Sequence, residues 1–121
     1  MKIIAIDHVQ LAMPAGAEDK ARNFYSGILG LTEIPKPAEL ANRGGVWFQS
    51  DIVILHLGVE ADFRPNRKAH PALLVDDLNS FIDACQSHEI EIDTTQPRIL
   101  GYNRAHVFDP FGNRIELMQK L

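Results

Sequence analysis

The chain has 121 residues, 45% of them hydrophobic, which suits one compact domain with a substantial core. A net charge of −4 with scattered basic residues argues against nucleic acid as a partner, and no stretch reaches the about 18 apolar residues that span a bilayer. One cysteine, Cys85, excludes an internal disulfide and a cysteine-based zinc site. The opening MKIIAIDHVQLAMP indicates a strand rather than a signal peptide, so we expect a cytoplasmic protein with no membrane partner.

The first half of the sequence predicts the element order βαβββ. Glu18 and Asp19 open the helix, and Gly30 ends it. The last two strands are joined at Ser50 and Asp51. In chain order the pattern predicts a strand, a helix and three more strands, at residues 3–12, 18–30, 31–34, 44–50 and 51–59.

The second half repeats this order after a polar, proline-containing linker at residues 60–68. Either Asp76 or Asp77 caps the helix, whose apolar residues recur at spacings of three and four. The predicted elements are a strand, a helix, a short strand and a hairpin, at residues 70–75, 78–85, 89–92 and 103–118. The sequence therefore predicts an α+β fold, one domain over 1–121 built from two βαβββ modules at about 1–60 and about 68–121.

Equivalent positions in the two modules carry matched polar residues. His8 and His70 belong to the first strand of each module, and His56 and Glu116 belong to the last. Two copies of one unit can pack about a pseudo-twofold axis, which brings equivalent residues together. Period-two alternation places the four side chains on one face, away from their apolar neighbours. We therefore expect Glu116 to face three histidines.

Three imidazoles and one carboxylate around a cavity suit a divalent transition metal. Two histidines and a carboxylate already suffice, and they leave coordination positions free for water or substrate, as in catalytic sites. The donor set does not choose between zinc, nickel, manganese and iron. The alternative is that each strand histidine is a structural residue held by hydrogen bonds.

Five motifs together carry a resemblance that spans almost the whole chain. They are DHVQLAMP at 7–14, FYSGILGL at 24–31, LHLG at 55–58, HPALLVDDL at 70–78 and FDPFGNRIEL at 108–117. The chain resembles the vicinal oxygen chelate superfamily, which contains glyoxalases, bleomycin resistance proteins and extradiol dioxygenases. The resemblance implies paired βαβββ modules whose curved mixed sheets enclose a metal-site cavity. It also implies ligands on the first and last strands of each module, at His8, His56, His70 and Glu116.

The resemblance leaves the reaction open, because members of the superfamily isomerise, open epoxides, cleave rings or only bind drugs. We expect a metal-dependent, glyoxalase-like enzyme of the lyase or isomerase type, whose small substrate chelates the metal through adjacent oxygens. Lewis-acid polarisation would stabilise an enediolate-type intermediate while His56 or Glu116 moves a proton. His56 stands where glyoxalase I enzymes usually have a carboxylate or Gln, so it is either a fourth ligand or a general base. The alternatives are a dioxygenase-type or thiol-transferase member, and a metal-free bleomycin-resistance-like protein that sequesters a drug.

Four further residues are candidates for the active site: His106 in catalysis, and Gln10, Trp47 and Arg104 in the substrate pocket. His106 precedes Glu116 by ten positions, where the extradiol dioxygenase signature has a tyrosine. A hairpin can place the two opposite each other, with His106 as an acid or base. Its alternatives are a hydrogen bond to a ligand or plain exposure. For Gln10, Trp47 and Arg104 the alternatives are polar lining, core packing and solvated surface.

The expected assembly is a homodimer. Two short modules leave open sheet edges and a half-lined cavity. The resemblance implies that chains of this length pair, so that each small-molecule site lies at the subunit interface.

Overall fold

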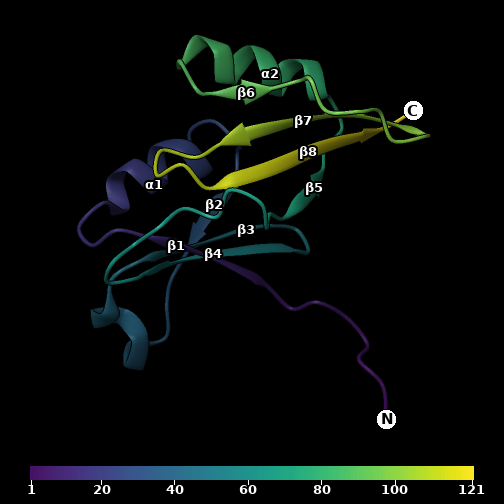
Figure 1. Ribbon diagram of the computed structural model, residues 1–121. Helices are drawn as coiled ribbons and strands as arrows, with labels where there is room; N and C mark the ends of the chain where they lie inside the picture. Colours follow the sequence, from purple (N-terminus) through teal and green to yellow (C-terminus); the bar gives the residue numbers. More distant parts are fainter. The chain divides into compact units, whose positions relative to one another are not determined.

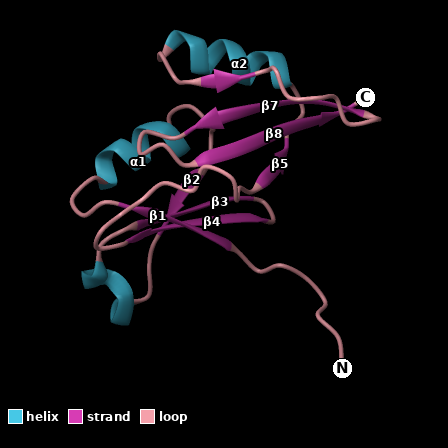
Figure 2. Ribbon diagram, viewed as in Figure 1, coloured by secondary structure: helices cyan, strands magenta, loops and turns pink.

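The computed structural model describes all 121 residues as two compact units, Met1–Phe63 and Arg64–Leu121. Each unit contains the strand and helix order βαβββ and one four-stranded mixed sheet (Figures 1 and 2). The predicted fold class, α+β with two βαβββ modules, is confirmed. No helix has the length and apolar character that a membrane span requires.

The first unit forms a sheet with strand order β1-β4-β3-β2, in which β1 and β4 are parallel and the other neighbours antiparallel (Figure 1). Tyr25 of the helix stacks on Phe48 of β3, with ring centroids 5.4 Å apart, and both side chains are buried. Successive strand residues point to opposite faces, so α1 covers the face that Trp47 does not occupy. The elements are β1 (Val9–Met13), α1 (Glu18–Tyr25), β2 (Thr32–Ile34), the 3-10 helix η1 (Ala38–Arg43), β3 (Val46–Ser50) and β4 (Val53–Val59).

The second unit repeats this arrangement with strand order β5-β8-β7-β6. The helix cap is Asp77, whose carboxylate accepts a hydrogen bond from the backbone N–H of Ser80 at 3.2 Å. Buried Leu78 and Cys85 lie on α2, and Val107 on β7 is also buried. The elements are β5 (Ala72–Leu74), α2 (Leu78–Ser87), β6 (Ile92–Asp93), β7 (Tyr102–Phe108) and β8 (Arg114–Lys120).

The prediction that the first strand begins at residue 3 is wrong, because β1 begins at Val9. Val9 pairs with Leu55, and β4 itself begins at Val53, so nothing in this sheet lies opposite residues 3–6. The segment runs out from β1 as extended chain (Figure 1). Alternation in sequence marks a side-chain pattern, whereas a strand also needs a hydrogen-bonded neighbour. Three apolar side chains are left exposed: Ile3 by 95%, Ile4 by 86% and Ile6 by 81%.

The prediction that the first helix continues to Gly30 is also wrong, because α1 ends at Tyr25. The backbone N–H groups of Ser26 and Gly27 both bond to the carbonyl of Arg22, which opens the regular helical ladder into turns. Gly30 has φ +76° and reverses the chain at the predicted place.

The FDPFGN motif forms the turn between β7 and β8. One carboxylate oxygen of Asp109 accepts hydrogen bonds from the backbone N–H groups of Phe111, at 2.9 Å, and Asn113, at 2.8 Å. The other accepts from the Asn113 side-chain amide at 2.9 Å, and Gly112 adopts φ +90°. The Asn113 amide oxygen in turn accepts from the backbone of Asn66 at 3.2 Å. The turn therefore fixes both the hairpin register and the segment that leads to His70.

Candidate functional site

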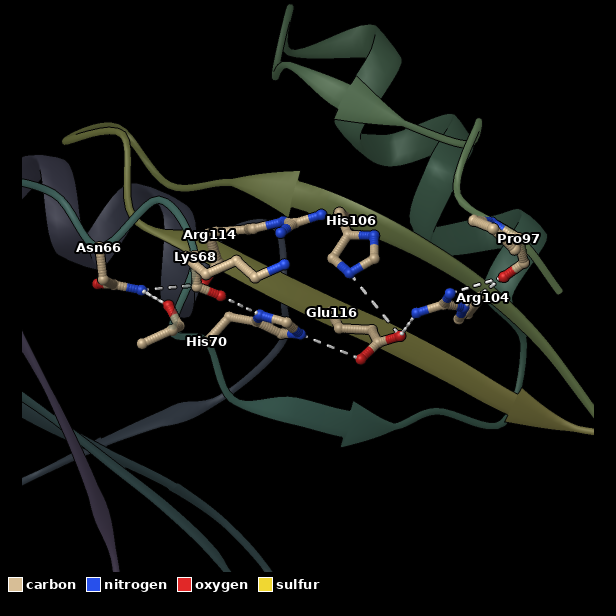
Figure 3. Close-up of polar contacts among 9 residues, drawn as sticks. Asn66, Lys68, His70, Pro97, Arg104, His106, Arg114 and Glu116 are labelled. Carbon is tan, nitrogen blue, oxygen red and sulfur yellow. Dashed lines mark hydrogen bonds and ion pairs between the residues drawn. The ribbon is translucent and has the colours of Figure 1, made fainter. Parts of the chain in front are cut away.

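Glu116 is the centre of a polar cluster in the second unit. It lies on β8, and its side chain is only 7% exposed. The hairpin register pairs it with His106 on β7, and Arg104 lies two residues earlier on the same strand and therefore on the same face. His70 lies just before β5, whose first residue, Ala72, is the other cross-strand neighbour of Glu116. Figure 3 shows His70, His106 and Arg104 converging on the Glu116 carboxylate.

The hydrogen bonds of His70 define its tautomer. A carbonyl oxygen only accepts, so the Nδ1–H of His70 donates to the carbonyl of Lys68 at 2.8 Å. In the neutral ring, Nε2 then carries a lone pair that faces Glu116 Oε2 at 3.3 Å. Two acceptors in this position repel each other unless a proton or a cation lies between them. A backbone carbonyl on the second ring nitrogen is also the usual support of a metal-binding histidine.

The backbone holds His70 in this orientation. The side-chain amide of Asn66 donates to the carbonyl of Ala69 at 2.6 Å, and the Asn66 carbonyl accepts from the backbone N–H of Arg114 at 3.0 Å. The segment before β5 is thereby attached to the start of β8 (Figure 3). These bonds from the Asn66 side chain and backbone fix the position of His70 relative to Glu116.

Arg104 donates a hydrogen bond to the other carboxylate oxygen of Glu116. Its Nη1 donates to Glu116 Oε1 at 2.6 Å, and its Nε and Nη2 donate to the carbonyl of Pro97 at 3.1 and 2.6 Å. The Arg104 side chain is only 16% exposed. A short, charge-assisted bond from a guanidinium anchored at its other edge is among the stronger polar contacts in proteins.

His106 is buried and only partly satisfied. Its side chain is 2% exposed, its Nε2 lies 3.8 Å from Glu116 Oε1, and its Nδ1 is buried without a hydrogen-bond partner. Its ring meets that of His70 edge-on, with centroids 5.1 Å apart. A buried polar atom without a partner costs about 1–3 kcal/mol, so Nδ1 is a destabilising feature of this ring, whereas Nε2 is the nitrogen that faces the cluster.

Burial and neighbouring charges shift the pKa values of the cluster. Burial alone would raise the pKa of Glu116, but hydrogen bonds from Arg104 and His70 outweigh it, and the pKa is lowered. Burial lowers the pKa of His106, and the positive charge of Arg114 adds to this effect. At neutral pH the site therefore combines an ionised carboxylate with a neutral His106 ring, which are the protonation states that a metal ion requires.

The donor atoms of His70, His106 and Glu116 all lie within 4.8 Å of one another. Two imidazoles and a carboxylate fit a divalent transition metal and leave positions open for other ligands. This triad includes His106, which the sequence suggested as an acid or base rather than as a ligand.

The remaining predicted ligands, His8 and His56, form an aromatic stack in the first unit. His8 precedes β1 and is partly exposed, and its ring lies on that of His56 with centroids 4.1 Å apart. His56 is buried on β4, and the indole of Trp47 covers it, parallel within 1° and at 3.7 Å. Burial, helped by the nearby His8, lowers the pKa of His56, so its ring is neutral near pH 7.

The structure also places the predicted pocket residues and reveals others. Gln10 and Trp47 line a cavity in the first unit, whereas Arg104 binds Glu116 in the second. Arg98 is bonded to the side chain of Asn103 at 3.1 Å. Sequence reasoning missed Lys36 and Arg43, which line the same cavity as Gln10. They lie beside or within the short helix η1 in a loop region, where no periodicity predicts which side chains meet.

Comparisons with known proteins identify the family. Residues 5–117 match the Glyoxalase/Bleomycin resistance protein/Dioxygenase superfamily. The chain belongs to this superfamily. Among solved structures it is similar to a glyoxalase family protein from Bacillus anthracis, with 44% identity and a TM-score of 0.93, covering 100% of this chain and 98% of that one. A search of curated proteins finds no match.

Two more distant solved structures share the fold. One is the fosfomycin resistance protein FosX from Listeria monocytogenes, solved with Mn(II) and 1S,2S-dihydroxypropylphosphonic acid, at 14% identity and a TM-score of 0.82, covering 99% and 95% of the two chains. The other is TnmS3, an antibiotic binding protein from Streptomyces sp. CB03234, at 22% identity and a TM-score of 0.72, covering 98% and 100%. At identities this low, the structural likeness establishes the fold and leaves the activity open.

Proposed function

We propose that the chain is a metal-dependent, glyoxalase-like enzyme acting on a small oxygenated molecule that chelates the metal. The observation that carries this proposal is the convergence of two imidazoles and one ionised carboxylate: one donor atom each of His70, His106 and Glu116, all within 4.8 Å of one another. A divalent cation would be bound by all three groups at once. Membership of a superfamily in which FosX binds Mn(II) supports the same conclusion.

In this proposal His70 and Glu116 hold the metal, and His106 is a third donor or a proton acceptor. The metal supplies Lewis-acid polarisation of the substrate. Glu116, with its lowered pKa, stays ionised and is suited to ligation. His106 and His56 are neutral near pH 7 and can each accept a proton from a substrate carbon or hydroxyl. His8 and His56 remain proposed ligands on the strength of the family resemblance.

We also propose that the protein is a homodimer whose sites draw on both subunits. The exposed Ile3, Ile4 and Ile6 support this, because three large apolar side chains on one extended segment need an apolar cover. The apolar surface of a second copy of the chain can bury these side chains, so no other partner is needed.

Metal binding by histidine variants tests the proposed function. Protein purified without an affinity tag and stripped with a chelator is titrated with Mn²⁺, Zn²⁺ and Ni²⁺ by calorimetry. We expect about one ion per chain, and losses of about 10²-fold or more for His70→Ala and for Glu116→Gln, because each removes a donor. His88→Ala is the matched control, since His88 is exposed on the C-terminal side of α2 and bonds only to the carbonyl of Ala84. Equal affinity in all four proteins would show that the metal site is misassigned.

A second candidate function, metal-free ligand sequestration, is favoured by one observation. Arg104 already neutralises Glu116, so the carboxylate is satisfied without an ion. TnmS3 shows that the fold also occurs in an antibiotic binding protein. Absence of binding for all three ions in the calorimetric titration would select this candidate. The dioxygenase-type and thiol-transferase alternatives share the metal and are distinguished from the leading proposal by substrate screening.

A further inference from the structure

The first unit contains a cavity of about 240 Å³ that plays no part in the ligand set proposed above. Trp47, Gln10 and Gly58 line it from the sheet. Trp47 and Gln10 are the two cross-strand neighbours of His56, so the cavity lies beside that histidine on the same face. The cavity is also lined by Leu40 and Arg43, which belong to η1, and by Lys36, which lies two residues before η1.

Both basic residues of the cavity lack an acidic partner. The Lys36 amino group donates to the carbonyl of Gly44, which leaves two of its N–H groups and its full charge unneutralised. Arg43 forms no ion pair either. Glu18 also reaches this turn, but its carboxylate accepts a hydrogen bond from the backbone N–H of Gly45 at 3.1 Å. In a chain with net charge −4, two cations in one cavity with no ion pair to a carboxylate are an excess of positive charge.

The sheet side of the cavity is flat and largely fixed. The indole of Trp47 is held by its parallel stack on His56 at 3.7 Å. Gly58 contributes no side chain, and a Cβ at this position would collide with the side chain of Gln10. The site therefore combines an indole ring and an amide group from the sheet with two positive charges from the η1 segment.

We propose that this cavity binds a small organic anion, with an oxyanion such as a carboxylate or phosphonate between Lys36 and Arg43 and a flat apolar body against Trp47. The volume is below the about 300–1,000 Å³ of pockets for drug-sized ligands, so the ligand is smaller than a typical drug. The inference rests on the proposed function only where it takes this anion as the substrate. The oxyanion is then the group by which the protein recognises its substrate. Binding itself requires no metal.

The chain has one tryptophan, so any tryptophan fluorescence change comes from Trp47, which lines this cavity. Metal-free protein in EDTA and low salt is titrated with benzoate, phenylphosphonate and the neutral analogue benzyl alcohol. We expect saturable changes with both anions and binding at least tenfold weaker for benzyl alcohol. Lys36→Met and Arg43→Met should each weaken benzoate binding about tenfold, the loss of one charge-assisted hydrogen bond.

Lys20→Met is the matched control, because Lys20 is exposed on α1 of the same unit and the substitution removes the same charge. It should bind benzoate like the parent. Lys36→Arg, which keeps the charge, should retain affinity within a few fold and covers the case in which Lys36→Met fails to fold.

The proposal is overturned if neither anion changes the fluorescence, if benzyl alcohol binds as well as benzoate, or if Lys20→Met loses as much affinity as Lys36→Met. Its failure is separate from that of the proposed function, because the assay contains no metal. If the protein binds anions but no metal, the anion site stands. Only the interpretation of the anion as the substrate of a metalloenzyme is then wrong.

Discussion

The ion pair between Arg104 and Glu116 leads to a prediction with a defined sign. Arg104 donates to Glu116 Oε1 at 2.6 Å in a site that is almost closed to solvent. A metal ligated by Glu116 must share the carboxylate with this guanidinium or displace it. Replacing Arg104 with Met removes the competing cation while keeping much of the apolar stem, so metal affinity should rise.

The size of the effect follows from the contact itself. A hydrogen bond between charged groups contributes about 1.5–3 kcal/mol, and about 1.4 kcal/mol corresponds to a tenfold change in affinity. Arg104→Met should therefore tighten Mn²⁺ binding roughly tenfold to a hundredfold, measured by calorimetry on chelator-stripped protein. Arg98→Met is the control, because Arg98 bonds to Asn103 and not to Glu116. If Arg104→Met binds metal as well as the parent or more weakly, Arg104 orients the carboxylate and does not compete for it.

The same variant should lose stability without metal, with a characteristic pH dependence. Glu116 has a lowered pKa in the folded protein, so its contribution to stability is present above the pKa of the unfolded chain, about 4.3, and is lost as pH falls through the folded value. Arg104 causes most of this lowering against the opposing effect of burial. The difference in unfolding free energy between parent and Arg104→Met in EDTA should be largest near pH 7 and shrink at pH 4 and below. A pH-independent difference would attribute the loss to packing.

Three further predictions concern the scaffold. Asp109→Ala removes the acceptor of three hydrogen bonds in a buried turn and should lower the unfolding free energy by about 2–4 kcal/mol in urea titrations, whereas exposed Asp83→Ala should change it little. Cys85 is fully buried and burial raises its thiol pKa, so it should react with Ellman's reagent only after unfolding; rapid reaction of folded protein would show that α2 opens readily. Ile6→Glu should convert the proposed dimer to monomer in sedimentation equilibrium while Ile52→Glu, equally exposed in a turn, should not, and a monomeric parent at micromolar concentration would contradict this.

The fold was predictable because two independent patterns agree along the chain. Apolar periodicity marks the strands and helices, and the repetition of βαβββ limits how they assemble. Asp77 as a helix cap and Asp109–Asn113 as a hairpin turn follow from local chemistry that needs no tertiary information. The error at residues 3–8 has the opposite origin: the alternating pattern is genuine, but whether a strand forms depends on a neighbouring strand that the sequence of one segment does not encode.

The candidate site was predictable in its residues and less so in its contacts. Alternation and the hairpin register together place Arg104, His106 and Glu116 on one face of the sheet. Alternation does not determine whether a long arginine side chain turns toward the carboxylate or into solvent. The deciding contact is the carbonyl of Pro97, in the irregular segment before β7, which anchors the guanidinium at 2.6 Å. Arg104 was a candidate for the substrate pocket, with solvated surface as the alternative, and in the structure its guanidinium bonds to Glu116.

The two modules use equivalent backbone positions for different chemistry. In each unit the last strand carries a buried titratable residue, His56 or Glu116, and the register pairs it with Trp47 in the first unit and with His106 in the second. An indole opposite an imidazole gives a parallel stack, which lowers the solvation of His56 and provides a flat wall for an apolar ligand. An imidazole opposite a carboxylate gives a polar cluster of nitrogen and oxygen donor atoms, which favours a cation. The cross-strand neighbour, rather than the repeated position itself, therefore determines what each half of the chain can bind.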